Sequence, residues 1–519
     1  MVRQTRQTSV TVKQVQLHRY DGDILTVGLF EGTKRVPKEY ANLDKAVGGT
    51  IRDVLRLGDF KGKANETTVL YRTGRVGCRR ILLVGLGRKD KIEPAVLRQA
   101  AGTAIRLADK LGASRLGLAL HTVVPAKIDA ETAGRVLAEG AVVGRYKYQD
   151  YLSADKESKE VGTIRVFIVE PKAAAASKLN QGRKTGTILG RSQNRARAVA
   201  NKPGNEINPP LLGREAKKIA RQFGLKCRVF NDRHLVEMGM NAILAVGGGS
   251  ADKPRLIMLE HKGRRRGGRK GGTARGKAVT GPDVVVVGKA ITFDSGGISL
   301  KPSAKMEEMK FDKAGGCAVL GIMTAVAQLK LPLNVVGLIP SAENLPSQTS
   351  YRPGDIIRTY SGKTVEVQNT DAEGRMILSD ALAYAAKMKP AAIIDMATLT
   401  GACVVALGEH NAGLFGNNDA LKKKIEKAAE VSGEAVWAMP SGPEYLKQMK
   451  SKIADLKNTG DRKGGSCTAA AFLGEFVGDV PWVHIDIAAV ADTDSEKPWR
   501  GIGATGFGVR LVVEYIRGC

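Results

Sequence analysis

Cysteine, histidine and aromatic residues are scarce in this chain of 519 residues, and each scarcity narrows what the protein can be. The six cysteines are scattered, with no CxxC pair and no framework spacing, which predicts reduced thiols in a cytosolic protein. The six histidines show no paired spacing, which argues against histidine ligation of a metal. Only 5% of the residues are aromatic, and no stacking module or nucleic-acid recognition motif is present.

Long apolar runs are also absent. No stretch approaches the ~18 apolar residues of a membrane span, and the opening MVRQTRQTSVTVKQVQLHRYDGD lacks the apolar core of a signal peptide. We therefore expect a cytoplasmic protein with no membrane partner. Acidic residues are few relative to basic ones, and the formal net charge of +29 predicts attraction to polyanions such as nucleic acid while saying nothing about the fold.

Apolar, strand-like runs alternate with helical patterns throughout, which predicts an α/β fold. The runs in the second half, such as DVVVVGKAITFD and AAIIDMATLT, are apolar enough to be buried on both faces of a sheet. We predict two α/β domains, each a central, mostly parallel or mixed sheet flanked by helices. Residues 1–183 would form the N-terminal domain, 184–205 a linker helix, and 206–519 the second domain.

One segment fits neither pattern. Residues 262–277, KGRRRGGRKGGTARGK, contain eight basic residues and six glycines, and nothing able to form a core. Such a composition is typical of a basic loop inserted into a domain. If the protein binds nucleic acid, this loop is the expected contact.

The segment NTDAEGR, Asn369 to Arg375, places charges two residues apart. It follows KTVEV, which alternates like a strand, and in an extended segment Asp371, Glu373 and Arg375 would share one face. Adjacent carboxylates repel one another unless a positive charge sits against them. A metal ion would satisfy this requirement.

A second group of charges lies in VGKAITFDSGGISLKP and MKFDKAGG, which supply Lys289, Asp294, Lys301 and Asp312. Asp294 ends an apolar strand, the position at which open α/β sheets place their ligands. If the strands before Asp294 and Asp371 belong to one sheet, four carboxylates can converge at one edge. Their charge balances two divalent cations, which suits a two-metal site with an activated water. Oxygen ligation favours Zn, Mn or Mg.

Each piece taken alone also has an ordinary structural explanation. An aspartate at a strand end often caps a turn or a helix, and NTDAEGR could cap a helix beginning near Met376. Lys289 and Lys301 could each be solvated or paired with an acid. The joint pattern favours a metal site over these alternatives.

These motifs, together with ATLTGA and the closing GATGFGVR, resemble the leucyl aminopeptidase family of cytosolic di-metal exopeptidases. The resemblance covers residues 198–516, and it is weaker in the first 170 residues, where it implies a macrodomain-like N-terminal domain. It implies that Lys289, Asp294, Asp312 and Glu373 hold a tightly bound metal, and that Asp294, Asp371 and Glu373 hold a more exchangeable one. Lys289 would have to be neutral, which two adjacent cations would favour.

By the same resemblance, Lys301 stays charged and stabilises the oxyanion, and Arg375 holds a bicarbonate that acts as a general base. Met309, Thr398 and Gly401 would line an apolar specificity pocket that prefers Leu-like or Met-like N-terminal residues. The cofactors would be two divalent metal ions, Mn or Zn, and the assembly a homohexamer.

Two residues depart from the family pattern. Ala290 replaces a usual glycine and could crowd the backbone beside Lys289. Lys313 replaces a usually apolar residue and could add charge near the site. Neither departure removes a ligand, so activity is expected.

Two functions follow from these observations. The favoured one is a metal-dependent aminopeptidase acting on peptide substrates. The alternative is a nucleic-acid-binding protein with a secondary or vestigial peptidase site, which the net charge and the basic loop support. The complete set of site residues favours the enzyme, because a vestigial site would be expected to have lost some of them.

Overall fold

The computed structural model describes residues 7–153, 162–263 and 281–519. The chain divides into two units, one formed by Met1–Arg191 with Asp494–Ile502 and the other by Ser192–Thr493 with Gly503–Cys519. A late segment of the chain therefore belongs to the first unit. The sequence-based domain boundaries at 183 and 206 remain a proposal about where independently folding domains begin and end.

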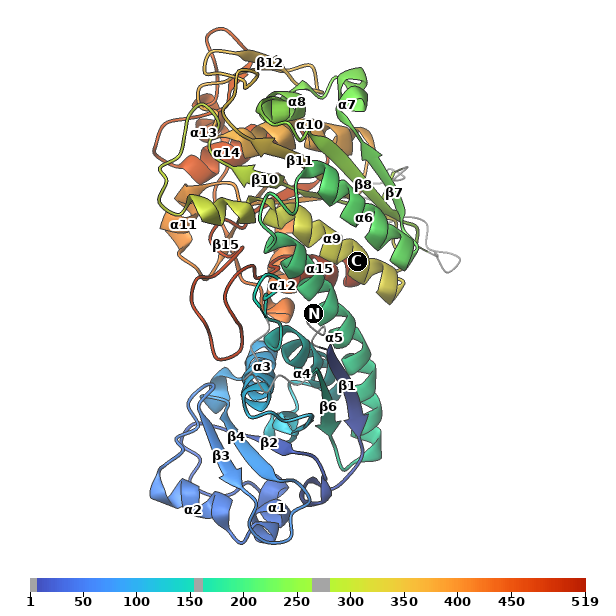
Figure 1. Cartoon of the computed structure of the whole chain (residues 1–519), viewed down its shortest axis with the longest axis vertical. Coiled ribbons are helices and arrows are strands. Elements are labelled where there is room, and N and C mark those ends of the chain that lie inside the picture. The colour runs from blue at the N-terminus through green and yellow to red at the C-terminus, as the bar shows by residue number, and fades with distance from the viewer. Residues whose placement is uncertain (1–6, 154–161, 264–280) are drawn as a thin grey trace. The chain divides into compact units, whose positions relative to one another are not determined.

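The first unit contains a six-stranded sheet in the order β1-β6-β5-β2-β4-β3 (Figure 1). Its neighbouring strands are parallel except for the pair β3 and β4. The strands are β1 (Gln7–Lys13), β2 (Ile24–Leu29), β3 (Thr67–Tyr71), β4 (Arg80–Gly85), β5 (Arg115–Leu118) and β6 (Thr163–Val169). Its helices are α1 (Ala41–Ala46), α2 (Thr50–Leu57), α3 (Pro94–Lys110), α4 (Ala130–Gly144) and most of α5 (Ala173–Ala200).

The apolar runs of this unit are buried on both faces of the sheet. Leu82 and Val84 of β4 pack in one core with residues of α3 and α4, while Ile81 and Leu83 pack in a second core with residues of α1 and α2. Successive side chains of a strand point to opposite faces, so a continuous apolar run feeds both cores.

The predicted linker helix begins earlier and ends earlier than expected, because α5 covers Ala173–Ala200. The alanines at 173–176 are strong helix formers and extend the helix toward its N-terminus. Pro203 and Gly204 end the helical pattern beyond it.

The second unit contains a nine-stranded mixed sheet in the order β16-β15-β18-β14-β9-β11-β8-β7, with β10 paired to β11. A separate three-stranded sheet has the order β12-β13-β17. The strands are β7 (Lys226–Phe230), β8 (Arg255–His261), β9 (Val284–Gly288), β10 (Ala290–Asp294), β11 (Val335–Asn344), β12 (Ile356–Arg358), β13 (Thr364–Glu366), β14 (Ile393–Ala397), β15 (Ala412–Gly416), β16 (Val436–Ala438), β17 (Leu456–Lys457) and β18 (Trp482–Asp486).

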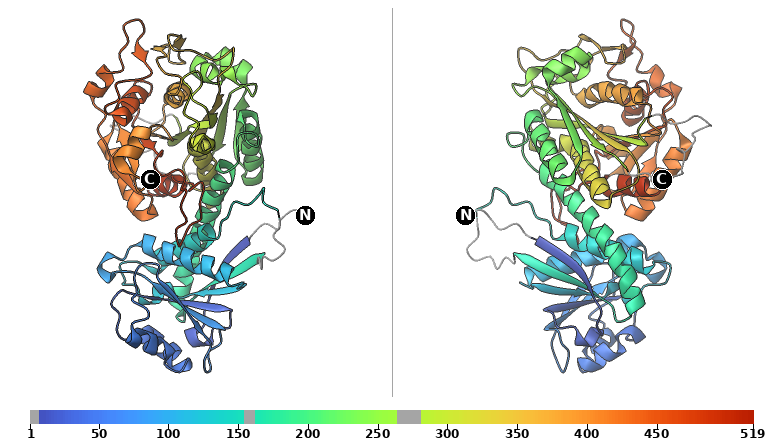
Figure 2. Two further views of the ribbon diagram at one scale, coloured as in Figure 1. Left: turned by 60° about the vertical axis from the view of Figure 1, so that its left-hand side comes forward. Right: turned by 90° about the vertical axis from the view of Figure 1, so that its right-hand side faces the viewer.

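Helices cover both faces of the large sheet (Figure 2). Val285 and Val287 of β9 pack in a core with α8, α10 and α14 on one face. On the other face Gly288 lies against α9, where an added Cβ would be 2.4 Å from the carbonyl oxygen of Gly315. The helices are α6 (Pro209–Phe223), α7 (Asp232–Met238), α8 (Asn241–Val246), α9 (Ala314–Leu329), α10 (Glu373–Lys387), α11 (Gly401–Leu407), α12 (Asp419–Ser432), α13 (Pro443–Lys447), α14 (Gly465–Gly474) and α15 (Val509–Arg517).

The predicted fold class is confirmed: both units are α/β, with mixed or mostly parallel sheets flanked by helices. Strands β9, β11, β14 and β18 run parallel to one another, so their carboxyl ends lie at one edge of the large sheet. This edge holds the candidate site.

Candidate metal centre

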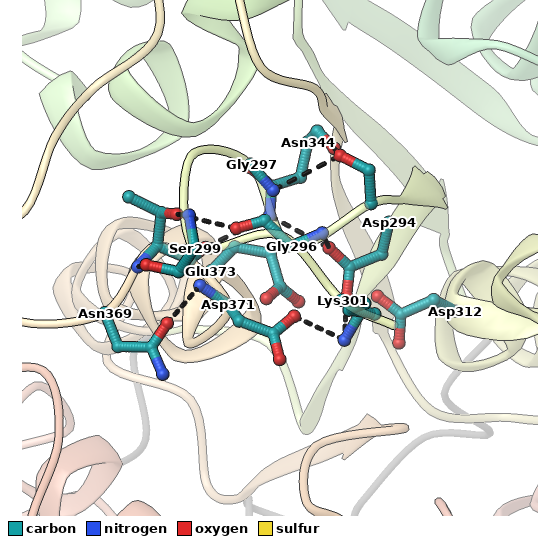
Figure 3. Close-up of polar contacts among 12 residues, drawn as sticks. Asp294, Gly296, Gly297, Ser299, Lys301, Asp312, Asn344, Asn369, Asp371 and Glu373 are labelled. Carbon is teal, nitrogen blue, oxygen red and sulfur yellow. Dashed lines mark hydrogen bonds and ion pairs between the residues drawn. The ribbon is translucent and has the colours of Figure 1, made fainter. Parts of the chain in front are cut away.

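The first acidic segment is a glycine turn that follows β10. Asp294 is buried at the end of this strand, and its Oδ1 accepts hydrogen bonds from the Gly296 amide at 3.0 Å and from Asn344 Nδ2 at 2.9 Å (Figure 3). Gly296 and Gly297 have φ angles of +88° and +68°, and an added Cβ would be 2.5 Å from the Ser299 carbonyl oxygen and 2.7 Å from Asn344 Oδ1, respectively. The turn that presents Asp294 therefore requires both glycines.

The second acidic segment, residues 369–373, is held against the first by Thr370. Its Oγ1 donates to the Gly296 carbonyl at 2.6 Å and accepts from the Ser299 amide at 2.8 Å. Asn369 Oδ1 accepts the Asp371 amide at 2.8 Å, which closes a local turn just before the helix. These bonds fix Asp371 and Asp294 next to each other.

The expected geometry of this segment is wrong in two respects. Glu373 opens helix α10, so Asp371, Glu373 and Arg375 do not alternate along an extended strand. The preceding strand β13 belongs to the three-stranded sheet and not to the sheet that contains β10. The carboxylates nevertheless converge, because the turn at 369–372 carries the chain from one sheet to the edge of the other.

Asp312 and Lys289 approach the same point from other elements. Asp312 lies in the 3-10 helix η6 (Met306–Lys313), and Lys289 directly follows β9. Lys289 Nζ lies 2.8 Å from Asp312 Oδ1 and 2.7 Å from Glu373 Oε1, and it donates to the Thr398 carbonyl at 2.8 Å. An added Cβ at Gly374 would be 2.7 Å from Lys289 Nζ, which explains the glycine that follows Glu373.

Lys301 reaches the other pair of acids. Its Nζ lies 2.9 Å from Asp294 Oδ2 and forms an ion pair with Asp371 Oδ1. The two lysines thus contact different carboxylates: Lys289 contacts Asp312 and Glu373, and Lys301 contacts Asp294 and Asp371.

Burial shifts the pKa values of Asp312, Asp371 and Glu373 upward. Burial, followed by repulsion from Asp294, raises the pKa of Glu373 to about 8, and burial raises the pKa of Asp312 to about 6. Burial also lowers the pKa of each lysine, but the neighbouring carboxylates outweigh it and the net pKa of both lysines is raised. A raised pKa means that the ionised form of an acid is unfavourable in this site. Additional positive charge, such as a bound cation, would stabilise the ionised carboxylates.

The donor set fits divalent cations. Asp294, Asp371 and Glu373 each offer an oxygen, and these oxygens lie within 4.8 Å of one another. Asp312 Oδ2 is buried and has no hydrogen-bond partner among the described residues. Carboxylate oxygens are the ligands that Mg, Mn and Zn accept. Ligation by Lys289 would in addition require that the cations depress its pKa, which the protein's own charges raise.

Arg375 lies in the first turn of α10. It is buried, its Nη1 donates to the Asn458 carbonyl at 2.8 Å, and burial lowers its pKa to about 10. Its Nε is buried, and no residue in the described part of the chain accepts a hydrogen bond from it. Arg375 therefore follows the candidate ligand Glu373 by about half a helical turn, and its Nε is free to donate to a bound group.

The expected pocket residues come from two regions. Thr398 follows β14, and its Oγ1 donates to Asp312 Oδ1 at 2.7 Å, which ties it directly to the acids. Gly401 is exposed and opens α11, whose cap residue Thr400 donates to Asp486 Oδ2 at 2.6 Å. Met309 is half-buried in η6, the 3-10 helix that carries Asp312.

The two departures from the family pattern are accommodated. Ala290 is buried, and it faces Gly316, where an added Cβ would be 2.7 Å from the Ala290 Cβ. Lys313 does not add charge among the acids, because its Nζ donates to the carbonyls of Lys202, at 2.7 Å, and Lys310. Burial lowers the pKa of Lys313 to about 8.

Sequence reasoning missed the residues that orient the acids, above all Asn344, Thr370 and Tyr351. Asn344 ends the apolar run LNVVGLIPSAEN, and a polar residue at that position was the available signal. Thr370 lies inside the recognised motif. Nothing in the sequence around Tyr351 indicates that its hydroxyl donates to the Thr370 carbonyl, at 2.7 Å.

Most of the basic loop predicted at 262–277 lies outside the described residues, which resume at 281. In the described part of the chain, no helix is both long enough and apolar enough to cross a membrane.

The fold and the site together define an α/β protein with a carboxylate-rich cluster at one edge of its large sheet, an arrangement suited to metal-assisted hydrolysis. The family description "Cytosol aminopeptidase family, catalytic domain" matches residues 194–513, and "Cytosol aminopeptidase family, N-terminal domain" matches residues 26–155. The chain belongs to the cytosol aminopeptidase family. It is an aminopeptidase of a metal-dependent family of hydrolases, and the resemblance inferred from its motifs is confirmed.

Individual relatives agree with this assignment. A probable cytosol aminopeptidase of Geotalea uraniireducens is 42% identical, with 95% of this chain and 96% of the relative covered. One of Cenarchaeum symbiosum is 44% identical, with 89% and 90% covered. A mutant of tomato leucine aminopeptidase superposes with a TM-score of 0.86 at 32% identity, covering 99% of this chain and 97% of that one. The bottromycin maturation enzyme BotP in complex with Mn gives 0.80 at 32% identity, with 96% and 99% covered.

Proposed function

We propose that this chain removes N-terminal residues, with a preference for Leu-like apolar ones, from peptides by a two-metal mechanism. The observation that carries the proposal is the convergence of Asp294, Asp371 and Glu373, whose oxygens lie within 4.8 Å of one another. The Mn complex of BotP, a similar structure, supports Mn as one of the metals, and Zn is the other candidate.

The family resemblance implies how the ligands divide. Lys289, Asp294, Asp312 and Glu373 would hold the tightly bound ion, and Asp294, Asp371 and Glu373 the more exchangeable one. When bound, the ions supply Lewis acidity and lower the pKa of water in the site. Asp371 is the most accessible of the four acids, with 32% of its side chain exposed, which suits the exchangeable position.

Lys301 would act on the substrate, and Arg375 would act on the transfer of the proton from the attacking water. The carboxylates around Lys301 raise its pKa, so its ammonium stays charged and can donate to the developing oxyanion. Arg375 would hold a bicarbonate that accepts the proton of the attacking water. Its unpartnered buried Nε supports an anion at this place.

The substrate specificity, the cellular location and the oligomeric state that we propose follow from the resemblance to the leucyl aminopeptidase family. Met309, Thr398 and Gly401 would line the pocket for the N-terminal side chain. We further propose a cytoplasmic homohexamer. The alternative of a nucleic-acid-binding protein has no observation in its favour among the described residues.

The proposal is tested by hydrolysis of leucine amide by the full chain before and after chelation, with Mn²⁺ and Zn²⁺ added back separately. Activity should disappear on chelation and return with at least one ion. Asp294→Ala should abolish both hydrolysis and the binding of two ions, because Asp294 serves both positions. An Asp294→Ala protein with full activity and two metals per chain would refute the two-metal assignment.

A further inference from the structure

The side chain of Asn344 touches both acidic segments through a single amide group. It is the last residue of β11, it is buried, and it lies opposite Asp294 in the parallel pairing of β10 and β11. Its Nδ2 donates to Asp294 Oδ1 at 2.9 Å and to the Thr370 carbonyl at 3.0 Å. Thr370 immediately precedes Asp371, so one amide group joins the backbone before Asp371 to the carboxylate of Asp294 (Figure 3).

The strand ladder alone does not place Asp294. The register of β10 against β11 shifts between Ile291 and Asp294, so regular pairing is interrupted just before the ligand. Asn344 connects β11 to the end of β10 again after this shift in register. Its carbonyl accepts from the Ser295 amide at 3.1 Å and from Ser295 Oγ at 2.8 Å, while its side chain binds Asp294.

The Thr370 carbonyl is held by a second donor. The buried hydroxyl of Tyr351 donates to it at 2.7 Å. Asn344 and Tyr351 thus share one acceptor, but only Asn344 also reaches Asp294. Loss of the tyrosine hydroxyl should therefore disturb Asp371 alone, whereas loss of the asparagine amide should disturb both acids.

The chemistry of this position requires a carboxamide. Both hydrogens of the NH₂ group are used, one for a carboxylate and one for a carbonyl. Aspartate has the same shape, but it would place an acceptor against two acceptors. Leucine has a similar volume and no donor.

We propose that Asn344 is a positioning residue that sets the separation of the two proposed metal sites by holding Asp294 and the Asp371 segment at once. This inference rests on the proposed function, because Asp294 and Asp371 are ligands only if the metals bind there. Residues that orient metal ligands typically change metal affinity roughly 10- to 100-fold when replaced.

The test measures Mn²⁺ binding by calorimetry on the chelator-stripped full chain. Asn344→Leu should weaken both binding events roughly 10- to 100-fold, and Tyr351→Phe should weaken only the weaker event. The matched control is Asn417→Leu. Asn417 Nδ2 donates to the Val480 carbonyl at 2.9 Å and its Oδ1 accepts the Trp482 amide at 2.8 Å, so its amide also binds the backbone of another segment, without contacting a proposed ligand. It should bind Mn²⁺ like the parent.

The outcomes separate the two proposals. A parent that binds no Mn²⁺ overturns the proposed function and this inference with it. A parent that binds two ions, together with an Asn344→Leu protein that binds them equally well, overturns only the inference. If Asn344→Leu does not fold, Asn344→Ser removes the same donors with less steric change, and parent-like affinities in that variant overturn the inference in the same way.

Discussion

Lys289 and Lys301 carry the same charge but contact different acids, and this difference separates their proposed roles. Lys289 is enclosed between Asp312 and Glu373, whereas Lys301 is 21% exposed and lies beside Asp294 and Asp371. We predict that Lys301→Ala lowers kcat for leucine amide by ~100-fold or more, the scale for the loss of one oxyanion donor, with metal content unchanged. Lys289→Ala should instead lose the tightly bound metal.

Metal analysis after dialysis, run beside steady-state kinetics, distinguishes the two variants. Interchangeable phenotypes would contradict the division of roles.

Arg375 gives a second prediction at the residue scale. If its guanidinium holds bicarbonate, Arg375→Ala should slow turnover while both metals stay bound, and added bicarbonate should no longer stimulate the reaction. Initial rates over a bicarbonate series, in parent and variant, provide the measurement. A variant that responds to bicarbonate as the parent does would place the anion elsewhere.

Among the elements, α8 and α10 are joined by one buried carboxylate. Asp380 of α10 accepts the amides of Ala242 and Ile243 at 2.9 and 3.0 Å, and the amide of Tyr360 at 2.7 Å. It therefore caps the N-terminus of α8 from a different helix and fixes the segment between β12 and β13. Asp380→Leu would leave three amides without this acceptor, so we predict a loss of ~2–5 kcal/mol in the free energy of unfolding, measured in urea.

The same carboxylate predicts a pH dependence. Burial raises the pKa of Asp380 to about 7, well above its usual value of 3.8, so the folded state holds a proton that the unfolded state releases. The contribution of this group to stability therefore falls as the pH rises from about 4 to about 7. The stability difference between the parent and Asp380→Leu should narrow over this range. A difference that does not narrow would show that Asp380 stays ionised in the folded state over this range.

The apolar runs predicted the main strands because a strand buried on both faces is mostly apolar, as β9 is. Strand β14 is apolar except for Asp395, whose buried carboxylate accepts from Trp482 Nε1 at 2.6 Å. Strand β13 is different. Its alternation is real, but alternation does not say which sheet a strand joins, and β13 pairs with β12 and β17. Helix α10 begins at Glu373 and not near Met376, and its cap residue Ala372 makes no side-chain hydrogen bond that would mark the start in the sequence.

The sequence predicted a set of candidate site residues, but it did not predict the network that orients them. Asp294 and Glu373 stand in recognisable motifs, whereas Asn344 and Tyr351 act through contacts with residues 50 and 19 positions away. Such contacts depend on how strands and turns meet in space, which local pattern does not specify. Helix α5 is longer than the predicted linker helix, which shows that local pattern also does not fix where a helix begins and ends.

At the scale of the whole molecule, the formal charge of +29 is the property that the aminopeptidase function does not explain. Eight of the basic residues stand in the segment 262–277, which contains none of the proposed ligands or pocket residues.

Replacing that segment with a short neutral turn should leave leucine-amide hydrolysis nearly unchanged. It should weaken any binding of duplex DNA and flatten its salt dependence, which has a slope of roughly −0.9 per neutralised phosphate. A salt titration of DNA binding by the parent and the loop-replaced chain, run beside the hydrolysis assay, measures both effects. Absence of binding by the parent at low salt would remove nucleic acid as a partner, and loss of hydrolysis in the replaced chain would instead connect the segment with the active site or with assembly.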